Sequence, residues 1–146
     1  MRVVIGVSRF SRGMTLGVRG MLVRDGHIIL VRHSYVPGWY MPGGGVEPGE
    51  SFYDALVREL HEEAGVVLDE PAELFGIYRQ GGADPRDHVA LYVCRHWSQP
   101  EPPKVPNLEI RACELFPLDN LPDGATEGTR RRIAEVNGGL APAVDW

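Results

Sequence analysis

Residues 43–66 have the sequence GGGVEPGESFYDALVRELHEEAGV, and the interpretation of the whole chain starts from them. The three glycines at 43–45 predict a loop. From Phe52 to Ala64 there is no Gly or Pro, and most residues are good helix formers. Ser51 is placed to cap the start of a helix and Gly65 to end it. The segment therefore predicts a glycine loop followed by a helix of about three to four turns.

Three glutamates cluster on this predicted helix. At about 100° per residue, Glu59 and Glu63 fall on the same side as the apolar residues of the first turns, and Glu62 lies at its edge. Like charges at this spacing destabilise an isolated helix by a few tenths of a kcal/mol per pair. Arg58 alone cannot neutralise three carboxylates, whereas hard divalent cations with oxygen ligands can. The pattern favours Mg²⁺, with Mn²⁺ as a substitute, and the lack of a nearby His or Cys cluster argues against zinc.

An acidic string of this kind, taken alone, is more often a solvated helix face. The whole segment is more specific: residues 44–66 fill every fixed position of the Nudix box, Gly-x5-Glu-x7-Arg-Glu-U-x-Glu-Glu-x-Gly-U, where U is aliphatic. Residues 39–45 and 116–122 also resemble members of that family. The chain is thus similar to the Nudix hydrolases of the MutT-like type.

The resemblance implies roles for individual residues. The implied metal ligands are the carboxylates of Glu59, Glu62 and Glu63 and a backbone carbonyl at Gly43 or Gly44. Arg58 and Glu50 would support these ligands, since a charged outer layer orients metal-binding carboxylates. A flexible glycine also lets the backbone at Gly44 approach a substrate phosphate closely.

The sequence leaves two candidates for the general base, one on the predicted helix and one further along the chain. Glu63 is the first choice, because a carboxylate beside a metal can take a proton from a water whose pKa the metal has lowered. The family also takes its base from glutamates far downstream. Glu109 is the downstream candidate here, and Glu114 is a weaker one. For Glu109, the alternative that it is only an exposed carboxylate at a strand edge is equally good.

Three arginines are candidate contacts for substrate phosphate. Arg32 precedes the glycine loop, although a basic residue at a strand end is more often simply solvated. Arg79 precedes the loop at 80–87 and Arg86 lies in it. Binding residues concentrate on loops carried by a rigid sheet. Trp39, by contrast, is expected to be a packing anchor.

The remaining chain predicts a mixed α+β domain. A β-hairpin is expected for 15–23 and 27–31 around Asp25-Gly26, with further strands near 73–78, 88–96 and 109–116 and a second helix near 126–136. The resemblance makes this more specific. It implies the Nudix fold, an α/β/α sandwich around a mixed β-sheet.

Bulk properties restrict the class of protein. A chain of 146 residues, 43% of them hydrophobic, fits one domain spanning 1–146. The net charge of -5 argues against broad binding to nucleic acid. Cys94 and Cys113 lie in apolar stretches, which predicts reduced thiols and a cytoplasmic protein, and the short apolar run at the start predicts neither a secretory signal nor a membrane span. A homodimer is the expected assembly if the chain associates.

The function implied by the resemblance is Mg²⁺-dependent hydrolysis of a phosphoanhydride. The substrate is either a nucleoside diphosphate linked to another moiety or a nucleoside triphosphate. Two alternatives remain. One is a nucleotide-sensing Nudix module without activity, which the complete set of box glutamates disfavours, and the other is a pyrophosphohydrolase of RNA 5′ ends, which the acidic charge disfavours.

Overall fold

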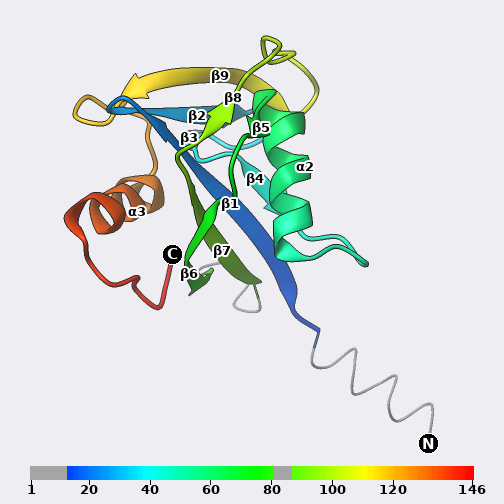
Figure 1. Ribbon diagram of the computed structural model, residues 1–146, viewed down its shortest axis with the longest axis vertical. Coiled ribbons are helices and arrows are strands. Elements are labelled where there is room, and N and C mark those ends of the chain that lie inside the picture. Colours follow the sequence, from blue (N-terminus) through cyan, green and yellow to red (C-terminus); the bar gives the residue numbers. More distant parts are fainter. Residues whose placement is uncertain (1–12, 81–86) are drawn as a thin grey trace, which may run out of the picture.

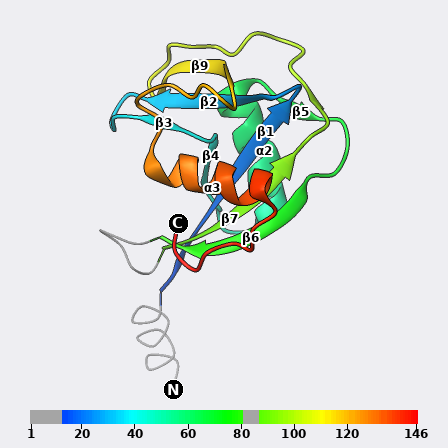
Figure 2. The ribbon, with the colours of Figure 1, turned by 90° about the vertical axis from the view of Figure 1, so that its left-hand side faces the viewer.

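The computed structural model describes residues 13–80 and 87–146, and strand β1 (Thr15–Arg24) explains how its layers form. Successive side chains of a strand point to opposite faces of a sheet. Val18 and Leu22 accordingly pack in one core with helix α2 (Phe52–Ala64), whereas Met21 and Val23 pack in a second core with helix α3 (Glu127–Gly138). The two helices therefore cover opposite faces of the sheet, as Figures 1 and 2 show.

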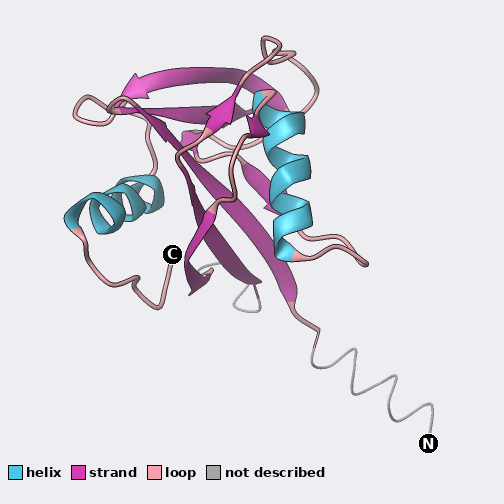
Figure 3. Ribbon diagram, in the orientation of Figure 1, coloured by secondary structure: helices cyan, strands magenta, loops and turns pink. Residues whose placement is uncertain are grey.

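The main sheet has the strand order β3-β2-β1-β7-β6, with β4 also paired to β1 and β9 to β2. Figure 3 shows the strands in magenta and the helices in cyan. Strands β5 and β8 form a separate ribbon. The bounds of these strands are β2 (His27–His33), β3 (Trp39–Tyr40), β4 (Gly43–Gly45), β5 (Val67–Leu68), β6 (Glu73–Arg79), β7 (Asp87–Cys94), β8 (Trp97–Ser98) and β9 (Ile110–Pro117). The pairing of β1 with β7 is parallel and the others are antiparallel. The expected α/β/α sandwich around a mixed sheet is confirmed.

The elements predicted from local signals are confirmed. The hairpin pairs Val23 with Ile28 across the turn. Helix α2 begins after Ser51, whose side chain accepts a hydrogen bond from the Asp54 N–H, and ends at Gly65 in the left-handed conformation. Helix α3 also lies within two residues of its predicted bounds.

The prediction of a loop at residues 43–45 is wrong. These glycines form strand β4, whose partner is the first half of β1, with Val18 opposite Gly44. A strand is predicted from the alternation of polar and apolar side chains, and three successive glycines have no side chains to alternate. The pairing arises because the first half of β1 is not paired with β2 on that side, and it places β4 directly beside α2.

Cys94 and Cys113 are free thiols, as predicted. Burial raises the pKa of Cys94 to about 12 and that of Cys113 to about 11, so both stay protonated at neutral pH. Within the described ranges, the helices are too short or too polar to cross a membrane.

Candidate active site

Helix α2 carries two buried carboxylates, Glu59 and Glu63, one turn apart. Glu63 is 6% exposed, and its Oε1 accepts a hydrogen bond of 2.9 Å from the N–H of Gly43. Glu59 lies against Gly44, where an added Cβ would stand only 2.5 Å from the Glu59 Oε1. The glycine strand thus provides the space that both carboxylates occupy. Glu62 lies on the exposed side of the same helix.

Arg58 joins the helix to the segment that precedes it. Its Nε and Nη2 donate to the two carboxylate oxygens of Glu50, both at 2.8 Å, and Nη2 also donates to the Gly45 carbonyl. Its Nη1 donates to Glu59 at 2.8 Å and to Glu62 at 3.4 Å. A bidentate guanidinium fixes orientation as well as charge. Arg58 therefore links the glutamate face to the glycine strand, a geometry that fits the predicted supporting role, which stays a prediction.

Burial and ion pairing shift the pKa values of these carboxylates in opposite directions. Desolvation raises the pKa of Glu59, partly opposed by the hydrogen bond from Arg58 and reinforced by the charges of Glu63 and Glu62. The hydrogen bonds from Arg58 lower the pKa of the partly buried Glu50 to about 2. Glu50 is therefore a permanent anion at neutral pH, whereas the charged form of Glu59 lacks full stabilisation. A cation near Glu59 would supply it.

The donor set at this site suits a hard divalent cation. Glu59, Glu62 and Glu63 offer only oxygen ligands, which Mg²⁺ and Mn²⁺ prefer. Among the residues that the structure describes, no three His, Cys, Asp or Glu side chains already surround one point. The three carboxylates instead bind Arg58, the Gly43 N–H and His33. The predicted ligand roles, including a carbonyl at Gly43 or Gly44, fit the chemistry and stay predictions.

His33, at the end of β2, is a site residue whose contact with Glu63 the sequence argument did not predict. Its Nε2 lies 3.4 Å from the Glu63 Oε2, and the residue is 6% exposed. A signal was present in the sequence, because His33 follows Ile29 and Val31 at the spacing of two that places strand residues on one face. That alternation predicts burial of His33, whereas the glutamate beside it comes from helix α2.

The downstream candidate Glu109 lies near the same end of β2. Ser34 donates its N–H to the Glu109 carbonyl at 2.9 Å, and His33 pairs with Ile110 in β9. Glu114 pairs with Leu30, further along the strand. Both glutamates are exposed. The structure thus brings Glu109 to the neighbourhood of Glu63 and leaves Glu114 further from that strand end, which favours Glu109 over Glu114 as the alternative base.

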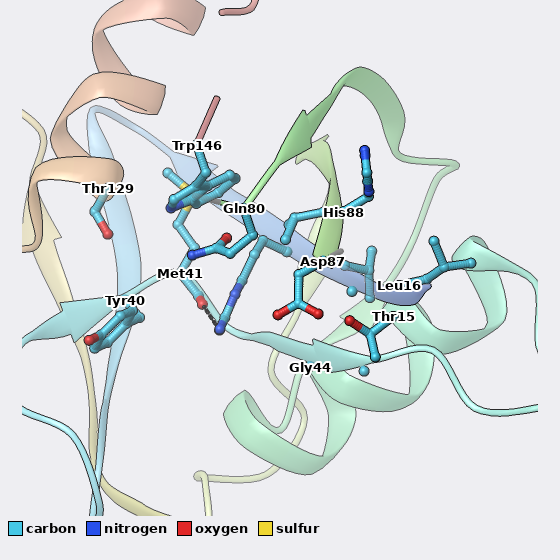
Figure 4. Close-up of a pocket in the computed structure, with 15 residues that line it drawn as sticks. Thr15, Leu16, Tyr40, Met41, Gly44, Gln80, Asp87, His88, Thr129 and Trp146 are labelled. Atoms are coloured by element: carbon cyan, nitrogen blue, oxygen red, sulfur yellow. Dashed lines mark hydrogen bonds between the residues drawn. The ribbon is translucent and has the colours of Figure 1, made fainter. Parts of the chain in front are cut away.

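A cavity of about 360 Å³ opens beside the glycine strand (Figure 4). Gly44 and Gly45 form part of its wall, together with the first residues of β1 and β7. Arg19 lines it too, and its Nη1 donates to the Met41 carbonyl at 2.8 Å, the dashed line in Figure 4. Trp146 and Gln80 stand together on another side of the cavity. Sequence reasoning pointed to Gly44 and to the loop at 80–87, and it missed the rest of the wall because distant segments build it.

The predicted arginine contacts fall elsewhere or outside the described residues. Arg32 is exposed, and its guanidinium lies 5.3 Å from the centre of the Trp39 ring. Trp39 itself is buried, as predicted. Arg79 donates to Asp145 at 2.7 and 3.1 Å. Arg86 lies outside the described residues. Neither Arg32 nor Arg79 lines the cavity.

Replacing Arg58 with lysine is expected to lower kcat/KM by about tenfold to a hundredfold, the usual effect of losing a residue that orients metal ligands. A lysine keeps the positive charge but cannot form the forked contact with Glu50 while holding Glu59 and Gly45. The measurement is steady-state kinetics, with Arg95→Lys on the exposed surface as the matched control. Wild-type kinetics in Arg58→Lys would contradict the orienting role.

Comparison with known proteins agrees with the geometry. A model of the NUDIX domain family matches residues 14–136. The solved MutT NUDIX hydrolase from Burkholderia pseudomallei is 31% identical with a TM-score of 0.74, over 84% of this chain and 97% of that one. An ADP-ribose pyrophosphatase structure from Streptococcus suis is 26% identical with a TM-score of 0.63, over 84% of this chain and 91% of that one.

Two curated relatives each match about half of this chain. The ADP-ribose pyrophosphatase of Methanocaldococcus jannaschii is 37% identical over 53% of this chain and 47% of that protein. The human diphosphoinositol polyphosphate phosphohydrolase 3-alpha is 41% identical over 48% of this chain and 42% of that protein. The chain thus spans less than half the length of these curated relatives. Since the family model covers most of its length, the chain belongs to the NUDIX domain family.

Proposed function

We propose that this protein is a magnesium-dependent hydrolase of a phosphoanhydride bond in a small nucleotide. The substrate is a nucleoside diphosphate linked to another moiety or a nucleoside triphosphate. One observation carries the proposal: two buried glutamates, Glu59 and Glu63, pack on a glycine strand that also borders a cavity. Burying a carboxylate that no cation fully neutralises costs free energy, and such carboxylates concentrate at functional sites.

Nudix hydrolases generally use divalent metal ions. In this chain, Glu59, Glu62 and Glu63 would hold Mg²⁺. The ion, when bound, neutralises phosphate charge and lowers the pKa of a coordinated water. Arg58 contributes orientation, because it binds two of these three glutamates and the outer Glu50 at once.

Proton transfer is assigned to Glu63. Its position is fixed by the Gly43 N–H on one oxygen and by His33 beside the other. A positioned carboxylate can accept the proton of the attacking water. Glu109 remains the alternative acceptor, since it lies by the same strand end and its exposed side chain is free to move toward substrate.

The test is a substrate panel in Mg²⁺ with separation of the products. It contains ADP-ribose, nucleotide sugars, dinucleotides, oxidised nucleoside triphosphates, a diphosphoinositol polyphosphate and a 5′-triphosphorylated oligonucleotide. Turnover of a nucleotide, with a nucleoside phosphate among the products, supports the proposal. Selective turnover of the oligonucleotide or the inositol compound would replace the substrate class, and binding without turnover of any compound would identify a sensing module.

Removal of divalent cations is expected to abolish turnover in this panel. Because the donors are all oxygen atoms, Mg²⁺ should restore activity after treatment with EDTA, and Mn²⁺ should substitute for it. The measurement is initial rate against added metal concentration, with Glu59→Gln as the comparison. We expect that variant to require at least about tenfold more Mg²⁺ for half-maximal rate. Full activity in EDTA would contradict metal dependence.

A further inference from the structure

The segment after α3 is fastened to the edge strand β6. The Arg79 N–H donates to the Val144 carbonyl at 2.8 Å, and the Trp146 N–H donates to the Arg79 carbonyl at 3.0 Å. The guanidinium of Arg79 adds a forked contact with both carboxylate oxygens of Asp145, at 2.7 and 3.1 Å. Residues 144–146 therefore extend the sheet by one short, anchored stretch.

This anchoring places the indole of Trp146 at the cavity. The ring packs edge-on against Tyr78, with centroids 5.3 Å apart and planes at 85°, and the Arg132 guanidinium lies 5.2 Å from its centre. A Cβ at Gly128 would collide with the indole. Glycine is a poor helix former, so its presence in the first turn of α3 keeps the space for this ring. Trp146 is only half-buried, and it lines the cavity beside Gln80 (Figure 4).

Most of the other described residues of the cavity wall are uncharged, which favours a neutral ring over a polyanion. Leu16, Met41 and Val89 offer apolar surface, and Gln80 and Thr15 offer hydrogen-bonding groups. Arg19 is the one Arg or Lys among the described residues of that wall, and its guanidinium already donates to a backbone carbonyl. A highly phosphorylated ring needs several cations around it. A nucleobase needs an aromatic platform and a few polar groups.

We propose that Trp146 is the platform on which the nucleobase of the substrate packs, with Arg79 and Asp145 as positioning residues. This rests on the proposed function and makes its substrate class more specific, because the moiety in the cavity is an aromatic base. The phosphates would then extend past Gly44 toward the glutamates of α2. The proposal accounts for the Arg79 contact, since this arginine acts through Trp146 and not through substrate phosphate.

The experiment compares binding of base-containing and base-free anions to the full chain in Mg²⁺. The probes are the four nucleoside diphosphates, tripolyphosphate and inositol hexakisphosphate, measured by titration calorimetry. Loss of base stacking weakens binding by about tenfold to a hundredfold. We therefore expect Trp146→Ala to weaken the best nucleoside diphosphate by that factor and to leave tripolyphosphate within about twofold, and Trp146→Phe to retain most of the affinity.

Two further variants separate the proposal from a folding defect. Gly128 is not part of the cavity wall, so Gly128→Ala should displace the indole and leave the other wall residues unchanged. It also gains helix propensity, so it should fold and reproduce the loss of base affinity. Asp145→Asn should weaken the anchor and give a smaller loss of the same selectivity. Because Trp39 and Trp97 are buried, the nucleotide should change the fluorescence of the wild type and not that of Trp146→Phe.

The outcomes distinguish this proposal from the proposed function. Equal weakening of nucleotide and tripolyphosphate in Trp146→Ala, or tighter binding of inositol hexakisphosphate than of any nucleotide, would overturn the base platform. Neither result bears on whether a phosphoanhydride is cleaved. Conversely, a wild type that binds nucleoside diphosphates through Trp146 but hydrolyses no compound of the panel would keep the platform and refute the hydrolase.

Discussion

Replacing Glu63 with glutamine is expected to lower kcat by about a hundredfold to ten-thousandfold, the range for loss of a positioned general base. The fold should survive, because the amide has the shape of the carboxylate. Its oxygen can still accept the Gly43 N–H, and its NH₂ can face the Nε2 of His33 in the tautomer that accepts. Steady-state kinetics in Mg²⁺, with circular dichroism to verify folding, makes the measurement.

The matched control is His61→Gln, an exposed change on the same helix. It leaves helix length and the glutamates intact, so kinetics should stay within about twofold of wild type. Activity of Glu63→Gln above a tenth of wild type would show that neither metal binding nor proton transfer depends on Glu63.

Glu109→Gln, measured in parallel, decides where the base is. If Glu63 accepts the proton, Glu109→Gln retains most of its activity, as an exposed strand-edge residue should. If Glu109 accepts it, this variant loses kcat with little change in the Mg²⁺ requirement, whereas Glu63→Gln mainly raises that requirement. Measuring the rate of both variants against Mg²⁺ concentration distinguishes these two outcomes.

The parts of the fold that the sequence predicted are those with local causes. Helix α2 was predicted to the residue because Ser51 and Gly65 mark its ends chemically. The hairpin followed from the tight turn at Asp25-Gly26. In contrast, β4 depends on pairing with β1, and β5 pairs with β8 from about thirty residues away in the chain. Such contacts leave no local pattern, so these short strands were not predicted.

The candidate site also has one part that the sequence predicted and another part that depends on contacts between distant segments. Helix geometry predicted that Glu59, Glu62 and Glu63 lie close together, and their roles as metal ligands were implied by the resemblance to the Nudix box. Arg79 was selected for its charge, and its partner Asp145 could not be foreseen because it lies 66 positions along the chain. The cavity joins β1, β7 and the segment after α3, and only the folded chain brings these together. The complete box motif therefore pointed to the chemistry, whereas most of the cavity wall left no pattern in the sequence.

The three glycines of β4 should respond to alanine in three different ways. A Cβ at Gly43 would collide with the Val18 carbonyl oxygen and stand 2.9 Å from the Arg19 Cα, both in the central strand β1. Backbone in the middle of a sheet cannot move aside, so Gly43→Ala should lower the free energy of unfolding by about 3 kcal/mol. At Gly45 no atom lies within 4 Å of the added Cβ. Gly45→Ala should be neutral within about 0.5 kcal/mol.

Gly44→Ala separates activity from stability. The added methyl would meet the Glu59 carboxylate at 2.5 to 3.0 Å, and a side-chain end can rotate away where backbone cannot. The fold should lose less than about 1 kcal/mol, while displacement of Glu59 should lower kcat/KM by about tenfold to a hundredfold. Urea unfolding and kinetics on all three variants provide the measurement. Wild-type activity in Gly44→Ala would show that the reaction does not need Glu59 in this position, because the added methyl group displaces its carboxylate.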